Sequence, residues 1–400
     1  MSTRSETIKI STPEGDQPSS FFLAFLSRPP QGSGPGLIFI TENLNINQEI
    51  EKEAIALSEE GYVVLVPDLS LFSSDNKYMI ICIERAIHRL TSVPERIGKM
   101  GIVGRGKGGD IAIQLMSKAS HDQQNPCLID CGVAYYPTMF EDHVSDLMKI
   151  RVPFVIHIPA DEKSNVATFI DQIKQSSSNG LVDIFKYERM SYGFAAPENQ
   201  NSAEINGITR MAFTRSLNIL RKVLGPYFDL SALWDKHIEY EFETKNVQMT
   251  MSTMTNEAYV NHVPTMAGAV GQKQIAQFYE HHFIHCNPPD SRIIPISRTI
   301  GLDRLVDEMV FCFTHTQEVD WILPGVAPTN KYVEIPLVVI VNFRGDKLHS
   351  EHIYWDQASV LAQIGLLNKE GLPITGAEQA KKVIDVNLPG YRFHKDVIFE

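Results

Sequence analysis

The chain lacks long apolar runs and has no surplus of basic residues. No stretch approaches the roughly 18 consecutive apolar residues of a membrane-spanning helix, and residues 1–6 lack the apolar core of a signal peptide. Lys and Arg number 36 against 48 Asp and Glu, which gives a net charge of −12. An acidic chain repels the phosphate backbone of nucleic acids. These absences predict a cytoplasmic protein that has neither membrane nor nucleic acid as a partner.

Residues that form disulfides or metal sites are also scarce. An odd number of cysteines, scattered through apolar surroundings, favours reduced and buried thiols over disulfides. The five cysteines are Cys82, Cys127, Cys131, Cys286 and Cys312. His281 and His285 stand one helical turn apart, but no third ligand accompanies them. The sequence therefore predicts no metal and no cofactor.

The first half of the chain has the pattern of an α/β domain. At 400 residues the chain exceeds what one hydrophobic core usually serves, so two domains are expected. Apolar runs typical of buried parallel strands alternate with segments of helical periodicity. The strand-like runs are 36–40, 61–67, 132–136 and 153–158. A helix predicted over 202–224 ends at Gly225-Pro226, which places the end of this domain at residue 226.

Residues 99–116 are the most informative stretch of the first domain. An apolar strand runs into a glycine-rich turn and then directly into a helix, as in a nucleophile elbow, where Ser or Cys stands at the apex. The apex here is Gly106, whose hydrogen atom cannot attack a carbonyl. The stretch keeps the glycines that permit a sharp turn but has lost the nucleophile.

The elbow also allows two anion-binding interpretations. Residues 104–109 fit the dinucleotide pattern G-x-G-x-x-G. That pattern belongs to the first strand–helix turn of a nucleotide-binding domain and requires an acidic residue about 20 positions later at the end of the next strand, which is missing here. Alternatively, Arg105 and Lys107 could help the helix N-terminus hold a carboxylate or phosphate group, or both could be solvated loop charges.

With these motifs the first domain resembles the dienelactone hydrolase family of α/β hydrolases. Other segments that carry the resemblance are 61–69, 134–137, 152–154 and 192–195. The family uses a triad of Cys at the elbow, an acid after a late strand and a His before a Gly/Ser-Phe-Ala stretch. The resemblance places Gly106 at the Cys position and Tyr192 at the His position. It places Glu162 or Asp161 at the acid position, with Glu42 as an assisting Glu. The resemblance thus implies a catalytically inactive domain.

Beyond residue 226 the pattern changes to long alternating strands. They are predicted over 293–299, 305–317, 332–343 and 348–356. Helices followed by a bent antiparallel sheet make an α+β, cone-shaped domain with an interior pocket over 227–370. Residues 371–400 are expected to form a C-terminal extension that packs on the body or on the second subunit of a homodimer.

Ionisable and aromatic side chains gather in this second domain, which holds nine of the 13 His and all three Trp. The densest run is 347–357. Strand alternation divides its side chains between two faces, with His352, Tyr354 and Asp356 on one and His349, Glu351 and Trp355 on the other. The sequence leaves open which face lines the pocket. Either face brings ionisable groups into an apolar setting, where pKa values shift.

The second domain resembles the SnoaL-like polyketide cyclases and ester cyclases of the nuclear transport factor 2-like superfamily over residues 233–367. The segments that carry the resemblance are 259–262, 298–304, 313–315 and 351–356. Members of known activity use an Asp or His in the cone as acid and base to close or isomerise a ring without a cofactor. The resemblance therefore implies acid/base chemistry in the interior of the cone.

The resemblance implies roles for particular residues. Asp356 matches the Asp of the motif and is the expected base, with His315 or His352 as the acid that returns the proton. Charge that develops on oxygen would be held by Tyr259 or Arg298. The residues expected around the substrate are Tyr259, His262, Arg298, Trp321 and Trp355.

Taken together, these features predict cofactor-independent proton abstraction next to a carbonyl of an apolar, oxygenated small molecule. Two alternatives stay open. The second domain could bind a small molecule or support assembly without catalysis, since buried His and Asp often satisfy one another, with the hydrolase-like half as a dimerisation platform. The first domain could instead retain ester or lactone hydrolase activity through another nucleophile.

Overall fold

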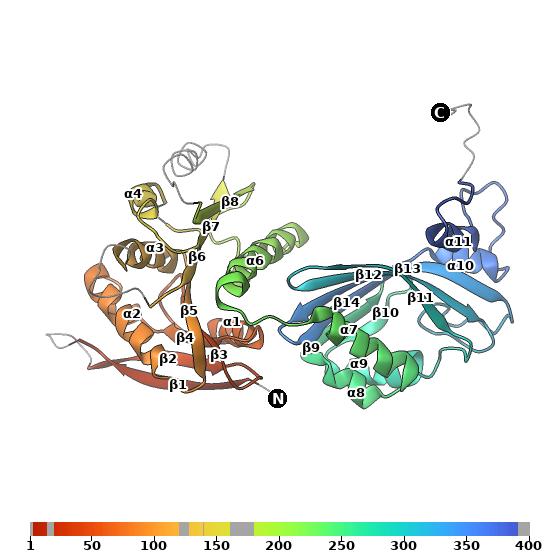
Figure 1. Ribbon diagram of the computed structural model, residues 1–400, viewed down its shortest axis with the longest axis horizontal. Coiled ribbons are helices and arrows are strands. Elements are labelled where there is room, and N and C mark those ends of the chain that lie inside the picture. The colour runs from red at the N-terminus through yellow and green to blue at the C-terminus, as the bar shows by residue number, and fades with distance from the viewer. Residues whose placement is uncertain (1–2, 14–19, 120–127, 139, 161–179, 391–400) are drawn as a thin grey trace, which may run out of the picture. The chain divides into compact units, whose positions relative to one another are not determined.

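The computed structural model describes residues 3–13, 20–119, 128–138, 140–160 and 180–390 (Figure 1). The chain divides into two compact units, Met1–Tyr227 and Phe228–Glu400, next to the boundary expected at residue 226. Of the described cysteines, Cys82, Cys131 and Cys312 are buried free thiols and Cys286 is a half-buried one. None of the described helices combines the length and the apolar character needed to span a bilayer.

The N-terminal unit is built on a sheet of eight described strands. They are β1 (Arg4–Ser11), β2 (Phe21–Arg28), β3 (Gly34–Ile40), β4 (Val63–Pro67), β5 (Arg96–Arg105), β6 (Cys131–Tyr135), β7 (Phe154–Ala160) and β8 (Val182–Glu188). Their order is β1-β2-β4-β3-β5-β6-β7-β8, with β1 and β2 antiparallel and the rest parallel to one another. Strands β3, β4 and β6 are buried along their whole length. The predicted α/β class is confirmed.

Helices cover both faces of this sheet. They are α1 (Gln48–Glu59), α2 (Asn76–Thr91), α3 (Lys107–Ala119), the short α4 (Val144–Leu147) and α6 (Ala203–Leu224), with 3-10 turns at Ser70–Phe72, Phe140–His143 and Pro197–Asn199. Figure 1 shows α1 and α6 on one face and α2 and α3 on the other. The side chains of Asn47, Asp75 and Ser202 accept hydrogen bonds at the first turns of α1, α2 and α6, which explains where these helices begin.

The C-terminal unit is an α+β domain, as predicted. Its described strands are β9 (Met254–His262), β10 (Ala267–Val270), β11 (Arg292–Ile300), β12 (Arg304–Thr314), β13 (Tyr332–Arg344) and β14 (Lys347–Trp355). The order is β10-β9-β14-β13-β12-β11, and every neighbouring pair is antiparallel except β14 and β9, which run parallel. The turn between Arg344 and Lys347 joins β13 to β14 as a hairpin.

Two helices of this unit end in π-helical turns. The helices are α7 (Leu230–Ile238), α8 (Val247–Ser252), α9 (Gln272–Phe278), α10 (Gln357–Gln363) and α11 (Glu378–Ile384). Helix α7 continues as the π turn Glu239–Glu243, and α9 continues as the π turn Tyr279–Phe283. Such turns are rare and occur frequently at functional sites. Figure 1 shows α7, α8 and α9 against one face of the sheet.

The two faces of the C-terminal sheet bury different residues. On β12 the odd-numbered side chains from Leu305 to Phe313 face the main core, beneath the helices. The even-numbered Val310 and Cys312 pack against Ala380 of α11 on the opposite face. The C-terminal extension therefore packs on its own unit up to α11, whereas residues 391–400 lie outside the described range.

Candidate functional site

The strand–turn–helix elbow forms in the N-terminal unit, but side chains fill the space at its apex. Gly106 lies between β5 and α3 at φ +51°, and its N–H donates to the Tyr135 carbonyl (2.9 Å). A Cβ at Gly106 would clash with the Tyr192 hydroxyl and would lie 2.7 Å from Glu42 Cγ. The space into which a nucleophile would project is therefore filled by side chains of the chain itself.

Tyr192 does not supply the missing base. Burial, together with the neighbouring Glu42 carboxylate, raises the pKa of Tyr192 above its usual value, so its hydroxyl stays neutral. The acid position, Glu162 or Asp161, lies outside the described residues. Among the residues that the structure does describe, the elbow has no nucleophile and no group placed to activate one.

The basic residues beside the elbow already have partners. Arg105 Nη1 donates to both carboxylate oxygens of Glu53, at 2.6 and 2.8 Å. Lys107 Nζ donates to the Ser73 carbonyl at 2.6 Å. Neither residue is a solvated loop charge, and neither is available to hold an anion at the N-terminus of α3. The anion-binding interpretation of the elbow therefore has no support.

The C-terminal unit, by contrast, contains a cavity between the inner face of its sheet and helices α7 and α9. Its enclosed volume is about 40 Å³, and the space grows to about 480 Å³ when the open mouth is counted. The apolar wall consists of Trp234, Ile238, Phe242, Val260, Phe283, Ile293, Met309, Phe311, Trp321, Leu337, Val339 and Ile353. The polar lining residues are Glu241, His262, Tyr279 and Glu351. A large apolar wall with a few polar groups suits a mostly apolar ligand.

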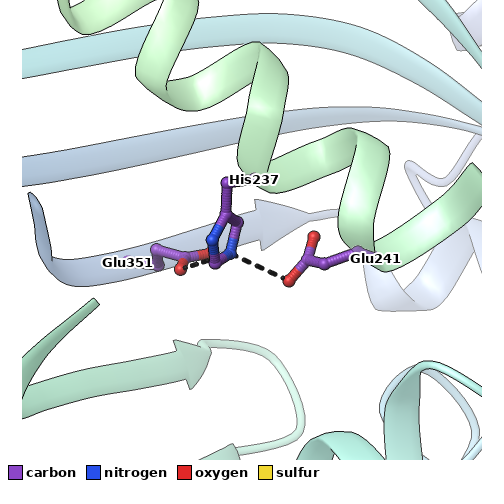
Figure 2. A group of neighbouring side chains, drawn as sticks. All are labelled: His237, Glu241 and Glu351. Carbon is purple, nitrogen blue, oxygen red and sulfur yellow. Dashed lines mark ion pairs between the residues drawn. The ribbon is translucent and has the colours of Figure 1, made fainter. Parts of the chain in front are cut away.

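Glu241 and Glu351 meet at the imidazole ring of His237, as Figure 2 shows. His237 Nε2 lies 3.1 Å from Glu241 Oε1 and 3.3 Å from Glu351 Oε1. The Tyr279 hydroxyl donates to Glu351 Oε1 at 3.4 Å. His237 and Glu241 come from α7 and its π turn, and Glu351 comes from β14. All four side chains are buried, so their charges interact with little screening from water.

The hydrogen bonds around His237 define its protonation. The Thr253 hydroxyl donates to the Thr250 carbonyl (2.6 Å), so it accepts its other short hydrogen bond from His237 Nδ1–H (2.6 Å). Nε2 faces two carboxylates and carries the second hydrogen. Burial alone lowers the pKa of His237, but Glu241 and Glu351 outweigh burial and raise it to about 10. His237 is therefore an imidazolium at neutral pH.

One imidazolium cannot neutralise two carboxylates, so Glu241 and Glu351 repel one another in this cluster. Burial raises the pKa of Glu241, and the charge of Glu351 adds to this effect against the attraction of His237. Burial, with Glu351 and Glu241, also raises the pKa of Tyr279 well above its usual value, which keeps that hydroxyl neutral. A carboxyl that titrates closer to neutrality in a cavity wall is suited to give and take a proton.

The same three residues have the composition of a metal site. The ligand atoms of His237, Glu241 and Glu351 lie within 4.8 Å of one another, which makes them the metal-type group among the described residues. A metal requires a neutral imidazole. The raised pKa of His237 thus favours protons as the occupants. The earlier candidates His281 and His285 are not part of this group.

Asp356, the expected base, does not line the cavity. Its carboxylate caps α10, accepting hydrogen bonds from the Ala358 N–H (3.0 Å), the Ser359 hydroxyl (2.5 Å) and the Gln379 amide (3.1 Å). Burial opposes ionisation, but these hydrogen bonds lower the pKa of Asp356. The placement is that of a helix cap and does not support a role as a base.

The other expected catalytic and oxyanion-binding residues also lie outside the cavity lining. His352 is on the face of β14 opposite to Glu351, with its ring centroid 5.3 Å from that of Tyr259. Arg298 forms ion pairs with Asp307 (2.8 Å) and Asp235 (2.6 Å). The open question of which face of β14 lines the cavity is answered by Glu351.

The remaining predicted residues divide between the cavity and the core. His315 is fully buried and outside the lining, and its Nδ1 accepts from the Thr329 N–H at 3.3 Å. His262 and Trp321 do line the cavity. The Trp355 ring lies behind them, with its centroid 6.1 Å from His262 and 5.7 Å from Trp321. Of the predicted substrate-binding residues, the structure thus brings three together.

Sequence reasoning missed His237, Glu241 and Tyr279 as site residues. One signal was present, since Trp234, Ile238 and Glu241 follow helical spacing and so place Glu241 on the apolar face of α7. An acidic residue on such a face is rarely buried without a partner. Its ion-pair partner His237 stands four positions earlier, whereas the second carboxylate, Glu351, lies more than 100 positions away on a strand whose inner face the sequence did not identify.

Comparisons with known proteins relate the two units to different folds. Residues 70–224 match the model of the dienelactone hydrolase family. The carboxymethylenebutenolidase of Pseudomonas putida is 21% identical over 223 residues, which are 50% of this chain and 90% of that enzyme. Among solved structures, the dienelactone hydrolase of Anabaena variabilis is similar over 56% of this chain and all of that chain, with 14% identity and a TM-score of 0.42. A protein with a ketosteroid isomerase-like fold from Catenulispora acidiphila, solved with trimethylamine, is similar over 34% of this chain and 93% of that chain, with 17% identity and a TM-score of 0.27.

Proposed function

We propose that the chain joins a dienelactone hydrolase-family domain without a working elbow to a C-terminal domain that transfers protons on a small molecule. The ligand is apolar and carries a carbonyl, and the reaction requires no cofactor. The observation that carries the proposal is Glu241, a buried carboxyl with a raised pKa in the wall of the cavity. The resemblance of this domain to SnoaL-like cyclases supports the same reaction class, with Glu241 in place of Asp356 as the base.

The proposed step moves one proton and breaks one C–H bond. The Glu241 carboxylate takes a proton from the carbon next to the ligand carbonyl, and the C–H electron pair becomes the enolate. The neutral Tyr279 hydroxyl lines the cavity and would donate to the oxygen on which negative charge develops, while the His237 imidazolium behind Glu241 offsets the charge of the two carboxylates. The Glu241 carboxyl then returns the proton to the same or another carbon of the ligand, which restores the starting state of the protein.

Exchange of a ketone's α-protons with solvent tests this proposal. The probe is 2-acetonaphthone, a two-ring methyl ketone, incubated with the full chain in deuterated buffer, and the loss of its methyl signal is followed by NMR. We expect catalysed exchange, and we expect Glu241→Gln to slow it by about 10²-fold or more, since a positioned acid/base group contributes that much. Asp356→Asn is the matched control, because it alters a carboxylate outside the cavity and should change the rate less than twofold.

Other results would refute the proposal. Binding of the ketone without exchange would favour a non-enzymatic binding protein. Exchange that survives in Glu241→Gln but disappears in Asp356→Asn would mean that Asp356, and not Glu241, abstracts the proton. Hydrolysis of a nitrophenyl ester that depends on the N-terminal unit would restore the hydrolase alternative. The expected homodimer stays a prediction.

A divalent metal centre is the second candidate, because the three ligand atoms lie close enough to share one ion. Such a centre would bind one zinc per chain through His237, Glu241 and Glu351 and would displace the proton from Nε2. Metal analysis after dialysis against zinc distinguishes the candidates. Bound zinc that is lost in His237→Gln would favour the metal centre, and its absence in the intact protein would favour the proton-transfer site.

A further inference from the structure

His262 is the polar residue of the cavity that the proton-transfer cluster does not include. It lies on β9, is 2% exposed, and is surrounded by the rings of Phe278, Phe283 and Trp321, with centroids 5.6, 5.4 and 4.9 Å away. His262 Nδ1 donates to the Ala267 carbonyl at 3.1 Å, because a carbonyl oxygen can only accept. The ring therefore has its orientation and its tautomer fixed by the β9–β10 hairpin.

This hydrogen bond leaves Nε2 of His262 as a hydrogen-bond acceptor. Burial lowers the pKa of His262 to about 4, so the ring is neutral at physiological pH. Among the described residues, Nε2 has no hydrogen-bond partner, although His262 lines the cavity. A ligand that enters the cavity and donates a hydrogen bond would pair with this acceptor.

The strand register sets the position of His262 relative to the cluster. Glu351 on β14 pairs with Val260 on β9, and Ile353 pairs with His262, so His262 is one diagonal step from Glu351 on the same face. The cavity thus places a hydrogen-bond acceptor on the same face as Glu351, one of the two carboxylates of the cluster.

We propose that Nε2 of His262 accepts a hydrogen bond from a hydroxyl or N–H group of the ligand and so selects the substrate. This inference rests on the proposed function and defines its substrate class. The substrate is an apolar molecule that carries a carbonyl beside an acidic C–H and, at a separate position, a hydrogen-bond donor. His262 is a specificity-determining residue, and the proton transfer itself belongs to Glu241.

Three ketones that differ at one position test the inference. They are 6-hydroxy-2-acetonaphthone, 6-methoxy-2-acetonaphthone and unsubstituted 2-acetonaphthone, and their dissociation constants are measured by quenching of tryptophan fluorescence. We expect the wild-type chain to bind the hydroxy ketone about tenfold more tightly than the other two, as one satisfied buried hydrogen bond provides. His262→Phe keeps a ring but removes the acceptor, so all three ketones should then bind equally. His315→Phe replaces a buried His outside the cavity and should leave the preference intact.

The wild-type series tests the inference even if His262→Phe fails to fold. Equal binding of the three ketones by the wild-type chain, or no binding of any of them, would overturn it. Imidazole nitrogen NMR supplies a second check, because a hydrogen on Nε2 of His262 would contradict the acceptor role. Loss of proton exchange in the wild type with the hydroxyl preference intact would refute the role of Glu241 and keep that of His262, so the two failures are distinguishable.

Discussion

At Gly106 in the N-terminal unit, Tyr192 and Glu42 occupy the space where a nucleophile would project, whereas in the C-terminal unit Glu241 and His262 border a space that no side chain of the described residues fills. Both units keep polar groups at the position where their folds place chemistry. The N-terminal unit satisfies them internally, and the C-terminal unit leaves them facing a cavity. The difference shows that a strand–turn–helix backbone does not by itself indicate a reaction, so function has to be argued from the accessible groups.

The largest expected effect comes from breaking the charge balance of the C-terminal cluster. His237→Ala leaves Glu241 and Glu351 buried without their counter-charge, and we expect the free energy of unfolding to fall by about 3–5 kcal/mol. All three tryptophans lie in the C-terminal unit, so their fluorescence during urea unfolding of the full chain reports on this unit. His282→Ala is the matched control, since His282 is exposed and its ion pair with Asp320 should contribute less than about 1 kcal/mol. Similar losses in both variants would contradict the charge balance.

The pH dependence of stability tests the same charge balance around His237. The pKa of His237 is about 10 in the folded chain and near 6.5 when unfolded, so its stabilisation is complete below pH 6.5 and is lost as the pH rises towards 10. We expect the tryptophan-detected free energy of unfolding to fall between pH 7 and pH 10, and to fall less in His237→Gln. A wild-type stability that is flat over this window would mean that His237 is not held as an imidazolium.

The blocked elbow can be tested with a matched pair of glycines. Gly106 (φ +51°) and Gly98 (φ +63°) share the left-handed conformation, but a Cβ at Gly98 has no atom within 4 Å. We expect Gly98→Ala to cost about 1 kcal/mol of unfolding free energy for the backbone alone. Gly106→Ala should cost about 2–3 kcal/mol, because the methyl group also clashes with Tyr192. The measurement is calorimetry of the transition that tryptophan fluorescence does not follow.

Removing the obstructing hydroxyl is the control for that experiment. Tyr192→Phe should recover part of the stability lost in Gly106→Ala and should leave Gly98→Ala unchanged. Equal costs at the two glycines, with no recovery, would show that the elbow is open.

The smallest effect is expected at Asp356. Asp356→Ala removes the N-cap of α10 and should lower the free energy of unfolding by about 1 kcal/mol, while Asp356→Asn, which keeps a capping oxygen, should change it by a few tenths. Urea unfolding followed by tryptophan fluorescence measures both. A loss of several kcal/mol in Asp356→Asn would indicate a buried charge instead of a cap.

The sequence predicted the layers of both units, but it predicted the candidate site only in part. Continuous apolar runs such as 36–40 and the alternation over 332–343 identified buried and half-buried strands. They did so because burial on one or both faces of a strand determines the local spacing of its apolar residues. The inner face of β14 depends on its register with β9 and β13, which local pattern does not encode. The sequence assigned Asp356 as a base, whereas the structure has it as the N-cap of α10, a position for which Asp is among the preferred residues.

The most direct test of the central claim is a site-resolved titration of Glu241 in the full chain. Carboxyl carbon NMR, with Glu241→Gln used to assign the signal, reports the pKa of this side chain. We expect the titration midpoint of the Glu241 carboxyl to lie above the usual Glu value of about 4.3, because Glu241 is buried beside a second carboxylate. A midpoint at or below that value would mean that Glu241 is an ordinary ion-pair partner of His237, and the proposed proton-transfer site would be wrong.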